Sequence, residues 1–363
     1  MRVHAAVLRE QDQPFSIEEM DLADPGPGEV LVRVAGAGLC HTDLLARQGV
    51  RLRLPLVTGH EGAGVVEAVG PGVSQVVVGD HVVLSFDSCG WCARCLGGEP
   101  AYCDEFMALN FSGLRPDGST PMSDRAGRPV PARWFGQSSH ATHAVATERN
   151  LVRVDPDLPL PLLGPLGCGM QTGAGAVLLA LKVPAGSTVA VFGTGAVGLA
   201  AVMAARIAGA SEIVAVERHA KRRELALELG ATRAVDGADP DLAAQLNAWT
   251  GGGVDCALDT TGVAAMVVTA LTALRPRGVC ALVGIGGDLV LPPHAMSAGR
   301  VLTFLLAGDA VPQRFIPQLI ALWRRDRFPF DRLVRTYPLT EINAAEQDSL
   351  SGETVKPVLV PAS

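Results

Sequence analysis

The amino-acid sequence predicts an α/β protein that combines a β-rich domain with a doubly wound parallel sheet. The chain has 363 residues, which is long for one hydrophobic core. Its first part alternates short β-branched runs with Gly and Pro turns, and its middle part alternates apolar strands with helix-length segments. The net charge of −7 and the lack of a long basic run argue against nucleic acid or an anionic membrane surface as the main partner.

The β-rich domain begins near the N-terminus. Between residues 2 and 86, β-branched runs are separated by turn sequences such as 24–28 and 70–72. No 3.6-residue period is sustained there, so a helical start is not expected. The predicted strands cover residues 3–8, 29–34, 64–69 and 81–84.

A cluster of cysteines follows these strands. Four thiolates in so short a stretch can close a tetrahedral shell around one zinc ion and leave no position for water, which is typical of a structural site. Metal binding would then supply folding free energy to a lobe of about residues 88–104 that has few apolar side chains. A disulfide pair or free thiols are the alternatives, and the spacing disfavours both. The residues are Cys89, Cys92, Cys95 and Cys103.

The chain then approaches a domain boundary. Residues 104–134 are polar and rich in Gly, Pro and Arg, and they predict a long loop. Residues 135–145 return to the β-rich domain, and residues 152–154 predict a short strand. Prolines recur between 156 and 165, which marks a crossing between domains rather than a helix or strand.

A dinucleotide-binding pattern opens the second domain. An apolar strand at 188–192 runs into a Gly-x-Gly-x-x-Gly turn and an Ala-rich helix at 199–208, and the next strand, 213–216, ends in Glu217. In this context the first glycine permits a tight turn, the second lets a pyrophosphate approach the backbone, and the third lets the helix pack on the strand. A plain glycine turn would not explain the acidic residue. The turn contains Gly193, Gly195, Val197 and Gly198.

Further alternation of helices and strands predicts the doubly wound parallel sheet. Cys256 and Cys280 lie inside apolar strands and are expected to be core residues. The predicted helices are 221–229, 242–249 and 264–274, and the predicted strands are 254–258 and 279–283, with a last apolar run at 301–306.

Three residues that are far apart in the sequence carry zinc-binding chemistry. Cys40 and His60 offer a thiolate and an imidazole, which zinc prefers as ligands. A catalytic zinc also needs a third protein ligand and one open position, and Cys168 in a turn-like run supplies that ligand. Taken singly, each residue is more simply explained as a buried cysteine or a hydrogen-bonded histidine.

Together with further motifs, these residues make the whole chain resemble the zinc-dependent medium-chain alcohol dehydrogenases, most closely the aryl (benzyl) alcohol dehydrogenase branch. The resemblance implies a discontinuous, β-rich GroES-like catalytic domain of residues 1–168 and 307–363 and a Rossmann domain of residues 169–306. It also implies a homodimer or homotetramer. The motifs that carry it lie at residues 40–43, 59–61, 135–139, 328–331 and 352–357.

The resemblance also implies roles around a catalytic zinc. Thr42 would carry the proton of the alcohol, Asp43 would orient His60, and Glu61 could ligate zinc in the resting enzyme. A plain loop aspartate and a buried partner of a nearby base are the alternatives for Asp43 and Glu61. Leu45 stands where other members carry the last histidine of the proton relay. Water, or the histidine that follows Cys40, would then release the proton.

NAD is the expected cofactor, because Glu217 would accept hydrogen bonds from the adenosine ribose and repel a 2′-phosphate. The basic run at 218–223 could instead receive the phosphate of NADP, although such a run is more often a solvated helix face. By resemblance, the pyrophosphate is contacted by His41 and Lys356, the ribose side by Arg222 and the nicotinamide carboxamide by Thr172.

The predicted reaction is hydride transfer between NAD and a primary aryl or allylic alcohol or its aldehyde. A thiol-adduct formaldehyde dehydrogenase of the same superfamily and a catalytically inactive dinucleotide-binding protein are the alternatives. Ser85, Phe111, His140 and Phe304 are expected near the substrate channel, and the last two differ from what the aryl branch leads us to expect. No apolar stretch reaches the ~20 residues of a transmembrane helix and no signal core is seen, so a soluble, cytoplasmic protein is expected.

Overall fold

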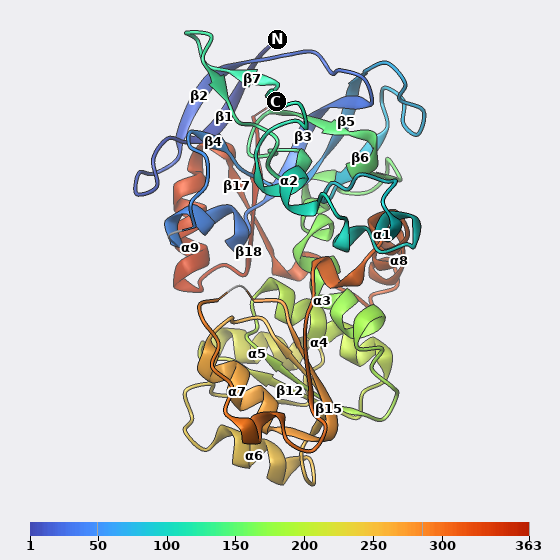
Figure 1. Ribbon diagram of the computed structural model, residues 1–363, viewed down its shortest axis with the longest axis vertical. Coiled ribbons are helices and arrows are strands. Elements are labelled where there is room, and N and C mark those ends of the chain that lie inside the picture. Colours follow the sequence, from blue (N-terminus) through green and yellow to red (C-terminus); the bar gives the residue numbers. More distant parts are fainter. Residues whose placement is uncertain (49, 285, 363) are drawn as a thin grey trace. The chain divides into compact units, whose positions relative to one another are not determined.

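The computed structural model describes residues 1–48, 50–284 and 286–362, and the chain forms two compact units (Figure 1). The first unit contains Met1–Cys168, Val311–Pro317 and Asp331–Ser363, and the second contains Gly169–Ala310 and Gln318–Phe330. The sequence predicts that residues 307–363 all belong to the catalytic domain, so the compact units differ from this prediction over 307–310 and Gln318–Phe330. Helix α8 (Pro312–Trp323) spans both units, which a sequence pattern cannot reveal.

Two sheets make up the first unit. One has the strand order β4-β1-β2-β7-β8, and the other has the order β10-β6-β5-β3-β18-β17, with β9 also paired to β3. The strands are β1 (Arg2–Leu8), β2 (Ser16–Leu22), β3 (Glu29–Gly38), β4 (Leu56–Val57), β5 (Glu61–Val69), β6 (His81–Leu84), β7 (Met122–Ser123), β8 (Pro129–Val130), β9 (His143–Thr147), β10 (Leu151–Val154), β17 (Val334–Pro338) and β18 (Lys356–Val360).

The predicted strands of this unit are confirmed, and the predicted strand at 81–84 coincides with β6. The sequence does not predict strand β2, because it is acidic and lacks a clear apolar alternation, but residues 16–21 pair with β1. The predicted long loop at 104–134 is wrong in part, since it contains β7, β8 and helix α2 (Phe106–Phe111). A helix so short shows no clear period in the sequence.

Further helices of the first unit are α1 (Ala93–Leu96) and α9 (Ile342–Ser351), together with several 3-10 helices, of which η1 (His41–Gln48) is the longest among the described residues. Among the described residues, no helix is long and apolar enough to cross a membrane.

The second unit is a parallel sheet with the order β13-β12-β11-β14-β15-β16. Successive strands are added to one side of β11 as far as β13 and then to its other side from β14 onward, and such sheets bind dinucleotides at this point of change. The strands are β11 (Thr188–Phe192), β12 (Glu212–Val216), β13 (Arg233–Val235), β14 (Val254–Asp259), β15 (Leu274–Leu282) and β16 (Val301–Phe304). The helices are α3 (Gly169–Gly175), α4 (Ala196–Ala208), α5 (Ala220–Leu229), α6 (Leu242–Trp249) and α7 (Ala264–Thr272).

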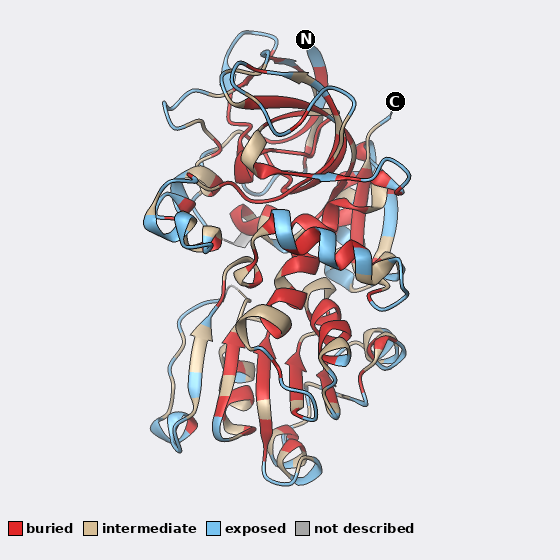
Figure 2. Cartoon of the chain, turned by 90° about the vertical axis from the view of Figure 1, so that its right-hand side faces the viewer, coloured by how far each residue is buried: buried red, intermediate tan, exposed pale blue. Residues whose placement is uncertain are grey.

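The core of the second unit lies between this sheet and its helices. Central strands are buried over most of their length, and helices α3 and α4 are mostly buried as well, whereas α5, α6 and α7 each have an exposed side (Figure 2). Cys256 and Cys280 are buried in β14 and β15, as predicted. Helix α7 ends two residues earlier than predicted, because strand β15 begins at Leu274.

Candidate functional site

Backbone pairing in the first unit brings together residues that are distant in the sequence. Strands β3 and β5 are antiparallel, with Gly38 opposite Glu61. Cys40, just after β3, and His60, just before β5, therefore emerge at the same end of the pair. A side chain at Gly38 would lie 2.0 Å from the Glu61 carboxylate, so only glycine allows this close approach. Cys168 joins them at the end of a segment whose Gly167 carbonyl accepts a hydrogen bond from Ser85 Oγ (2.6 Å).

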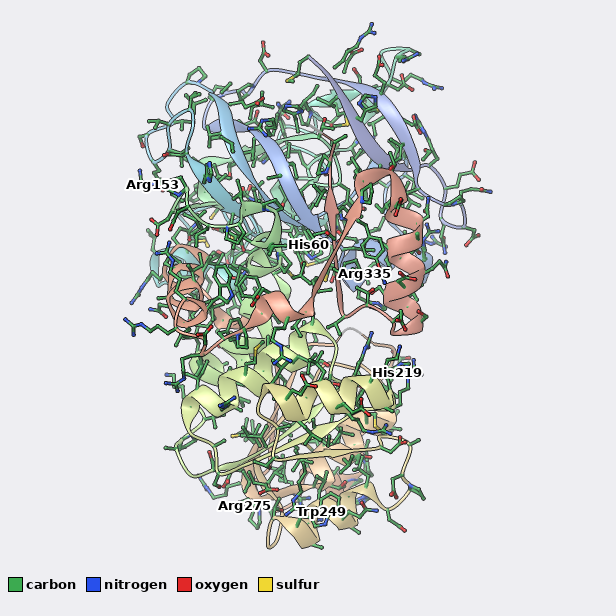
Figure 3. The ribbon with its side chains drawn as sticks, turned by 180° about the vertical axis from the view of Figure 1, so that it is seen from behind. His60, Arg153, His219, Trp249, Arg275 and Arg335 are labelled. Atoms are coloured by element: carbon green, nitrogen blue, oxygen red, sulfur yellow. The ribbon has the colours of Figure 1, made fainter. Side chains whose placement is uncertain are left out.

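These residues form a compact group of potential metal ligands. One ligand atom from each of Cys40, His60, Glu61 and Cys168 lies within 4.8 Å of every other. His60 and Glu61 are buried, and the two cysteines are partly buried. Figure 3 shows His60 inside the β-rich unit. Thiolate, imidazole and carboxylate are the ligand types that zinc takes in proteins.

The tautomer of His60 leaves one nitrogen directed at this group. Nδ1 lies 2.7 Å from Asp43 Oδ1, and Asp43 is ionised, so Nδ1 must donate the hydrogen bond. When the ring is neutral, its lone pair is therefore on Nε2, which is buried and makes no hydrogen bond among the described residues. Because the pKa of His60 is raised, a metal ion that binds Nε2 displaces a proton from it. A buried nitrogen without a partner is costly unless a ligand binds it. The arrangement fits a metal ion held by Cys40, His60 and Cys168.

The local charges favour a cation at this point. Burial would raise the pKa of Asp43, but the charges of His60 and His140 and the hydrogen bond from His60 hold it below its usual value. Burial would likewise lower the pKa of His60, yet Asp43 and Cys40 raise it well above its usual value. The hydrogen bond from Cys168, with help from His60 and Lys356, lowers the pKa of the Cys40 thiol, against its burial. A thiolate at Cys40 is the form that binds a metal.

Glu61 is paired with a buried base. Both of its carboxylate oxygens lie 2.9 Å from Lys356 Nζ, which also donates to the Leu39 carbonyl at 3.3 Å. Burial raises the pKa of Glu61 to about 7, although Lys356 opposes the shift. Glu61 therefore combines both roles considered from the sequence, as a potential metal ligand and as a partner of a base. The ammonium of Lys356 points to Glu61, so its contact with a pyrophosphate stays a prediction.

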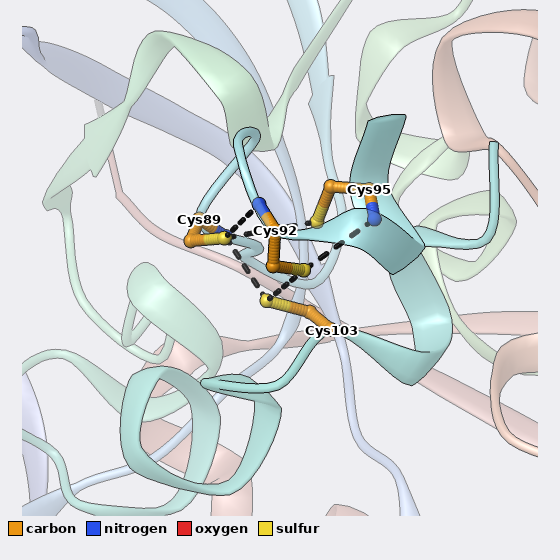
Figure 4. A group of neighbouring side chains, drawn as sticks. All are labelled: Cys89, Cys92, Cys95 and Cys103. Carbon is orange, nitrogen blue, oxygen red and sulfur yellow. Dashed lines mark hydrogen bonds between the residues drawn. The ribbon is translucent and has the colours of Figure 1, made fainter. Parts of the chain in front are cut away.

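The second group of potential ligands is the cysteine lobe (Figure 4). The Sγ atoms of Cys89 and Cys95 are 3.9 Å apart and those of Cys92 and Cys103 are 4.0 Å apart. Four sulfurs around a zinc ion at about 2.3 Å would be separated by about 3.8 Å. All four ligand atoms lie within 4.8 Å of one another, and none of these cysteines forms a disulfide. The geometry fits a closed zinc site.

Backbone N–H groups donate to sulfur atoms of the lobe and favour a thiolate at Cys92, whereas burial raises the pKa of Cys95 and Cys103. Cys92 N donates to Cys89 Sγ (3.3 Å), and Cys95 N donates to Cys92 Sγ (3.4 Å). Backbone hydrogen bonds from Cys95 and Asp104 lower the pKa of the Cys92 thiol to about 6.

A pair of hydrogen bonds closes the base of the lobe. Asp87 N donates to Asn110 Oδ1 (2.8 Å), and Asn110 Nδ2 donates to the Asp87 carbonyl (2.9 Å). Both residues are buried, so the chain segments that enter and leave the lobe are joined where they meet the core of the unit.

The glycine turn of the second unit fits a dinucleotide. Gly193 has φ +85°, and a side chain at Gly198 would lie 1.9 Å from the Gly193 carbonyl oxygen, so both positions require glycine. A side chain at Gly195 would meet no protein atom within 4 Å, so the space beside this backbone is open to a ligand. Gly195 also caps the N-terminus of α4, whose dipole favours a phosphate.

Glu217 directly follows β12, next to this turn. Its Oε2 accepts hydrogen bonds from Thr194 N (2.9 Å) and Thr194 Oγ1 (3.1 Å), and Oε1 accepts one from His219 N (3.0 Å). Burial would raise its pKa, but these hydrogen bonds and Arg222 lower it, so the side chain is ionised. Sequence reasoning missed Thr194, because the motif specifies only the glycines around it.

The other predicted residues lie on helices, strands and loops of both units. Thr42 is half-buried and His41 exposed on η1, where Leu45 is buried. Thr172 is half-buried on α3, and Arg222 lies on α5. Ser85 and His140 are buried, Phe111 packs against Trp134, and Phe304 is half-exposed on β16. Sequence reasoning also missed Trp134, which contacts Asp43.

Comparisons with known proteins agree with these features. Residues 26–156 match the family described as alcohol dehydrogenase GroES-like domain, and residues 196–320 match the one described as zinc-binding dehydrogenase. Geraniol dehydrogenase from Castellaniella defragrans is 47% identical over 98% of this chain and 97% of its own length. An NDMA-dependent alcohol dehydrogenase from Amycolatopsis methanolica is 38% identical over 99% of both chains.

Solved structures give the same result for the fold. The crystal structure of benzyl alcohol dehydrogenase from Acinetobacter calcoaceticus superposes with a TM-score of 0.95, at 41% identity, and covers 100% of both chains. An alcohol dehydrogenase zinc-binding domain protein from Burkholderia ambifaria gives a TM-score of 0.97 at 50% identity, again over 100% of both chains. The β-rich unit thus has the GroES-like fold and the second unit a Rossmann-like fold. The chain belongs to the zinc-binding medium-chain alcohol dehydrogenase family.

Proposed function

We propose that this protein is a zinc- and NAD-dependent dehydrogenase of primary aryl or allylic alcohols and their aldehydes. The observation that carries the proposal is the buried meeting point of Cys40, His60 and Cys168, with the lone pair of His60 Nε2 directed into it. The similarity to a geraniol dehydrogenase and to a benzyl alcohol dehydrogenase supports the substrate class.

Cys40, His60 and Cys168 would hold the catalytic zinc, and the four-cysteine lobe would hold a structural one. A zinc ion in an open site lowers the pKa of a hydroxyl group and polarises a carbonyl. Asp43 keeps His60 in the tautomer that binds metal. The hydroxyl of Thr42 carries the proton away from the alcohol. Leu45 offers no group for a further transfer, so water or the neighbouring His41 receives it.

NAD would bind at the glycine turn. The carboxylate of Glu217 is ionised and has Oε2 beside the turn, where the group can accept hydrogen bonds from ribose hydroxyls. The same negative charge repels a 2′-phosphate, which disfavours NADP. Arg222, Thr172 and His41 remain the proposed contacts to the ribose, the carboxamide and the pyrophosphate.

We also propose a homo-oligomer, dimer or tetramer, in the cytoplasm. Strand β16 is an edge strand of the parallel sheet. Its residues Val301 and Phe304 are 47% and 50% exposed. An exposed apolar edge strand favours pairing with another chain. All eight cysteines are free of disulfides, which supports a reducing compartment. Sedimentation equilibrium would test the oligomer, and a monomer at micromolar concentration would refute it.

The test of the function is zinc content per chain, measured together with reduction of NAD and of NADP by benzylic, allylic and aliphatic alcohols. We expect two zinc ions and preferential reduction of NAD with benzylic or allylic alcohols. An enzyme that turns over only when glutathione and formaldehyde are both present would identify the thiol-adduct reaction instead. A chain that retains zinc in the cysteine lobe alone and turns over no alcohol would refute the proposal.

A further inference from the structure

A segment of the first unit, residues 134–140, encloses the turn that carries His60. Ser139 N donates to the Gly59 carbonyl (2.9 Å) and His140 N donates to the Thr58 carbonyl (3.1 Å). The side chain of Gln137 donates to the His60 carbonyl (3.0 Å) and accepts a hydrogen bond from Gly62 N (3.1 Å). The backbone on both sides of His60 is therefore fixed by this one segment.

Trp134, the first residue of the segment, reaches the carboxylate behind His60. Its Nε1 lies 3.1 Å from Asp43 Oδ1, and both side chains are fully buried. The indole N–H can only donate, so the direction of this hydrogen bond is certain. Oδ1 also accepts from Gly59 N (3.0 Å) and His60 Nδ1 (2.7 Å). His140 Nε2 is 3.9 Å from Oδ2, which is too long for a hydrogen bond.

The remaining oxygen of Asp43 is held separately. Cys40 N donates to Oδ2 at 3.1 Å, so the carboxylate links the backbone of one proposed metal ligand with the side chain of another. A shift of Asp43 would therefore move Cys40 and His60 relative to each other. Trp134 approaches Oδ1 from a third direction and opposes such a shift.

The indole ring is itself fixed by aromatic packing. Phe111 and Phe135 contact it edge-on, with centroid distances of 5.3 and 5.4 Å. Phe135 in turn stacks on the His60 ring at 4.5 Å and 26°. The Trp134 N–H is thus presented at a defined position, which a flexible side chain could not achieve.

We propose that Trp134 is a positioning residue of the catalytic metal centre, which acts through its hydrogen bond to Asp43 and so holds His60 and Cys40 in their binding geometry. The inference rests on the proposed centre of Cys40, His60 and Cys168. Removing a residue that supports a metal-bound histidine through hydrogen bonds commonly weakens metal binding by about 10- to 100-fold.

The test is Trp134→Phe, which removes the N–H and keeps an aromatic ring between Phe111 and Phe135. Zinc release to a chelator would be followed for both sites of the same chain. We expect release from the catalytic centre to become about tenfold faster, and release from the cysteine lobe to stay unchanged. In protein with Co²⁺ at the catalytic centre, the ligand-field absorption bands should shift. Unaltered release and unaltered bands would overturn the proposal.

Two controls separate the hydrogen bond from packing. Phe111→Leu loosens the same aromatic cluster without removing the N–H, and Trp249→Phe makes the same substitution at a partly exposed position in the second unit. Trp249→Phe should leave zinc release from the catalytic centre unchanged, and Phe111→Leu should accelerate it clearly less than Trp134→Phe, because the N–H is retained. If Phe111→Leu accelerates release as much as Trp134→Phe, packing is responsible and the proposal fails.

Asp43→Asn tests whether Trp134 acts on the metal centre through Asp43. If Trp134 acts through the Asp43 carboxylate, adding Trp134→Phe to Asp43→Asn should not accelerate zinc release further, whereas an additive effect would overturn the route. If Asp43→Asn does not fold, the comparison with Phe111→Leu decides. A separate failure is recognisable: an unaltered protein with zinc in the cysteine lobe alone refutes the proposed function rather than the role of Trp134.

Discussion

The buried pair of Glu61 and Lys356 makes a strong prediction about stability. Replacing Lys356 with Met removes the base but leaves the carboxyl group in the same buried position. Breaking a buried ion pair on one side typically costs about 3–5 kcal/mol, because the remaining charge is uncompensated. We therefore expect Lys356→Met to be strongly destabilising, and Lys356→Met with Glu61→Gln to be considerably less so.

The double variant should be more stable than Lys356→Met by the free energy that Glu61 needs to take up a proton in the folded protein. The ordinary pKa of the carboxyl is 4.5, and in the folded protein burial raises it to about 7 even with Lys356 present. Without Lys356 it is higher still, so Glu61 is protonated in the fold at pH 7 and ionised after unfolding. Protonation against a pKa of 4.5 at pH 7 costs about 1.36 × 2.5, or roughly 3 kcal/mol.

The sign of the pH dependence is fixed by the same reasoning. A carboxyl whose pKa is raised by folding loses stability as the pH rises above its unfolded pKa. The advantage of the double variant over Lys356→Met should thus shrink from roughly 3 kcal/mol at pH 7 to about 0.7 kcal/mol at pH 5. Urea unfolding with hydrogen exchange of β3 and β18 would measure it. A rescue below 1 kcal/mol at pH 7, or one independent of pH, would refute the reasoning.

Three further predictions follow from the described contacts. Thr194→Val removes the hydroxyl that donates to Glu217 and should raise the KM for NAD about tenfold, whereas Thr194→Ser should restore it; equal kinetics of the two variants would contradict this role. Cys103→Ser should lower the zinc content by about one ion per chain, measured by atomic absorption, and loss of both ions would show that the sites are coupled. Glu29→Gln, which loses the ion pair with Arg115, should cost about 2 kcal/mol at pH 7 in urea unfolding. Because that ion pair, against burial, lowers the pKa of Glu29, the deficit should diminish as the pH falls below 4.5, and a constant deficit would speak against it.

Short-range patterns predicted much of the fold and of the candidate site. The cysteine cluster and the glycine turn are encoded within a few residues, because their spacing alone determines which groups can meet. The predicted strands at 81–84 and 188–192 coincide with β6 and β11, since continuous apolar runs identify buried strands.

Contacts between distant residues could not be predicted in this way. Lys356 and Glu61 are 295 positions apart and meet only because β18 pairs with β3, which in turn pairs with β5. Trp134 lies 91 positions from Asp43, in a stretch that the sequence predicts to be a loop. Neither contact leaves a periodic signal, because each depends on how the sheets and loops pack. The resemblance to a family supplied roles for Glu61 and Lys356, but not the ion pair between them.

The hydrogen bonds between Asp87 and Asn110 limit how much of the first unit unfolds when the cysteine lobe loses its metal. The two residues lie on either side of the lobe and close it into a loop that does not rely on the thiols. Loss of the metal would therefore release the lobe alone, as a local opening of low free energy, while both sheets of the unit remain folded. The circular dichroism of such a molecule would resemble that of the native protein, but the open lobe would be a new site for protease cleavage. In a cell short of zinc, limited proteolysis at the lobe would then mark the metal-free molecules for degradation before they unfold.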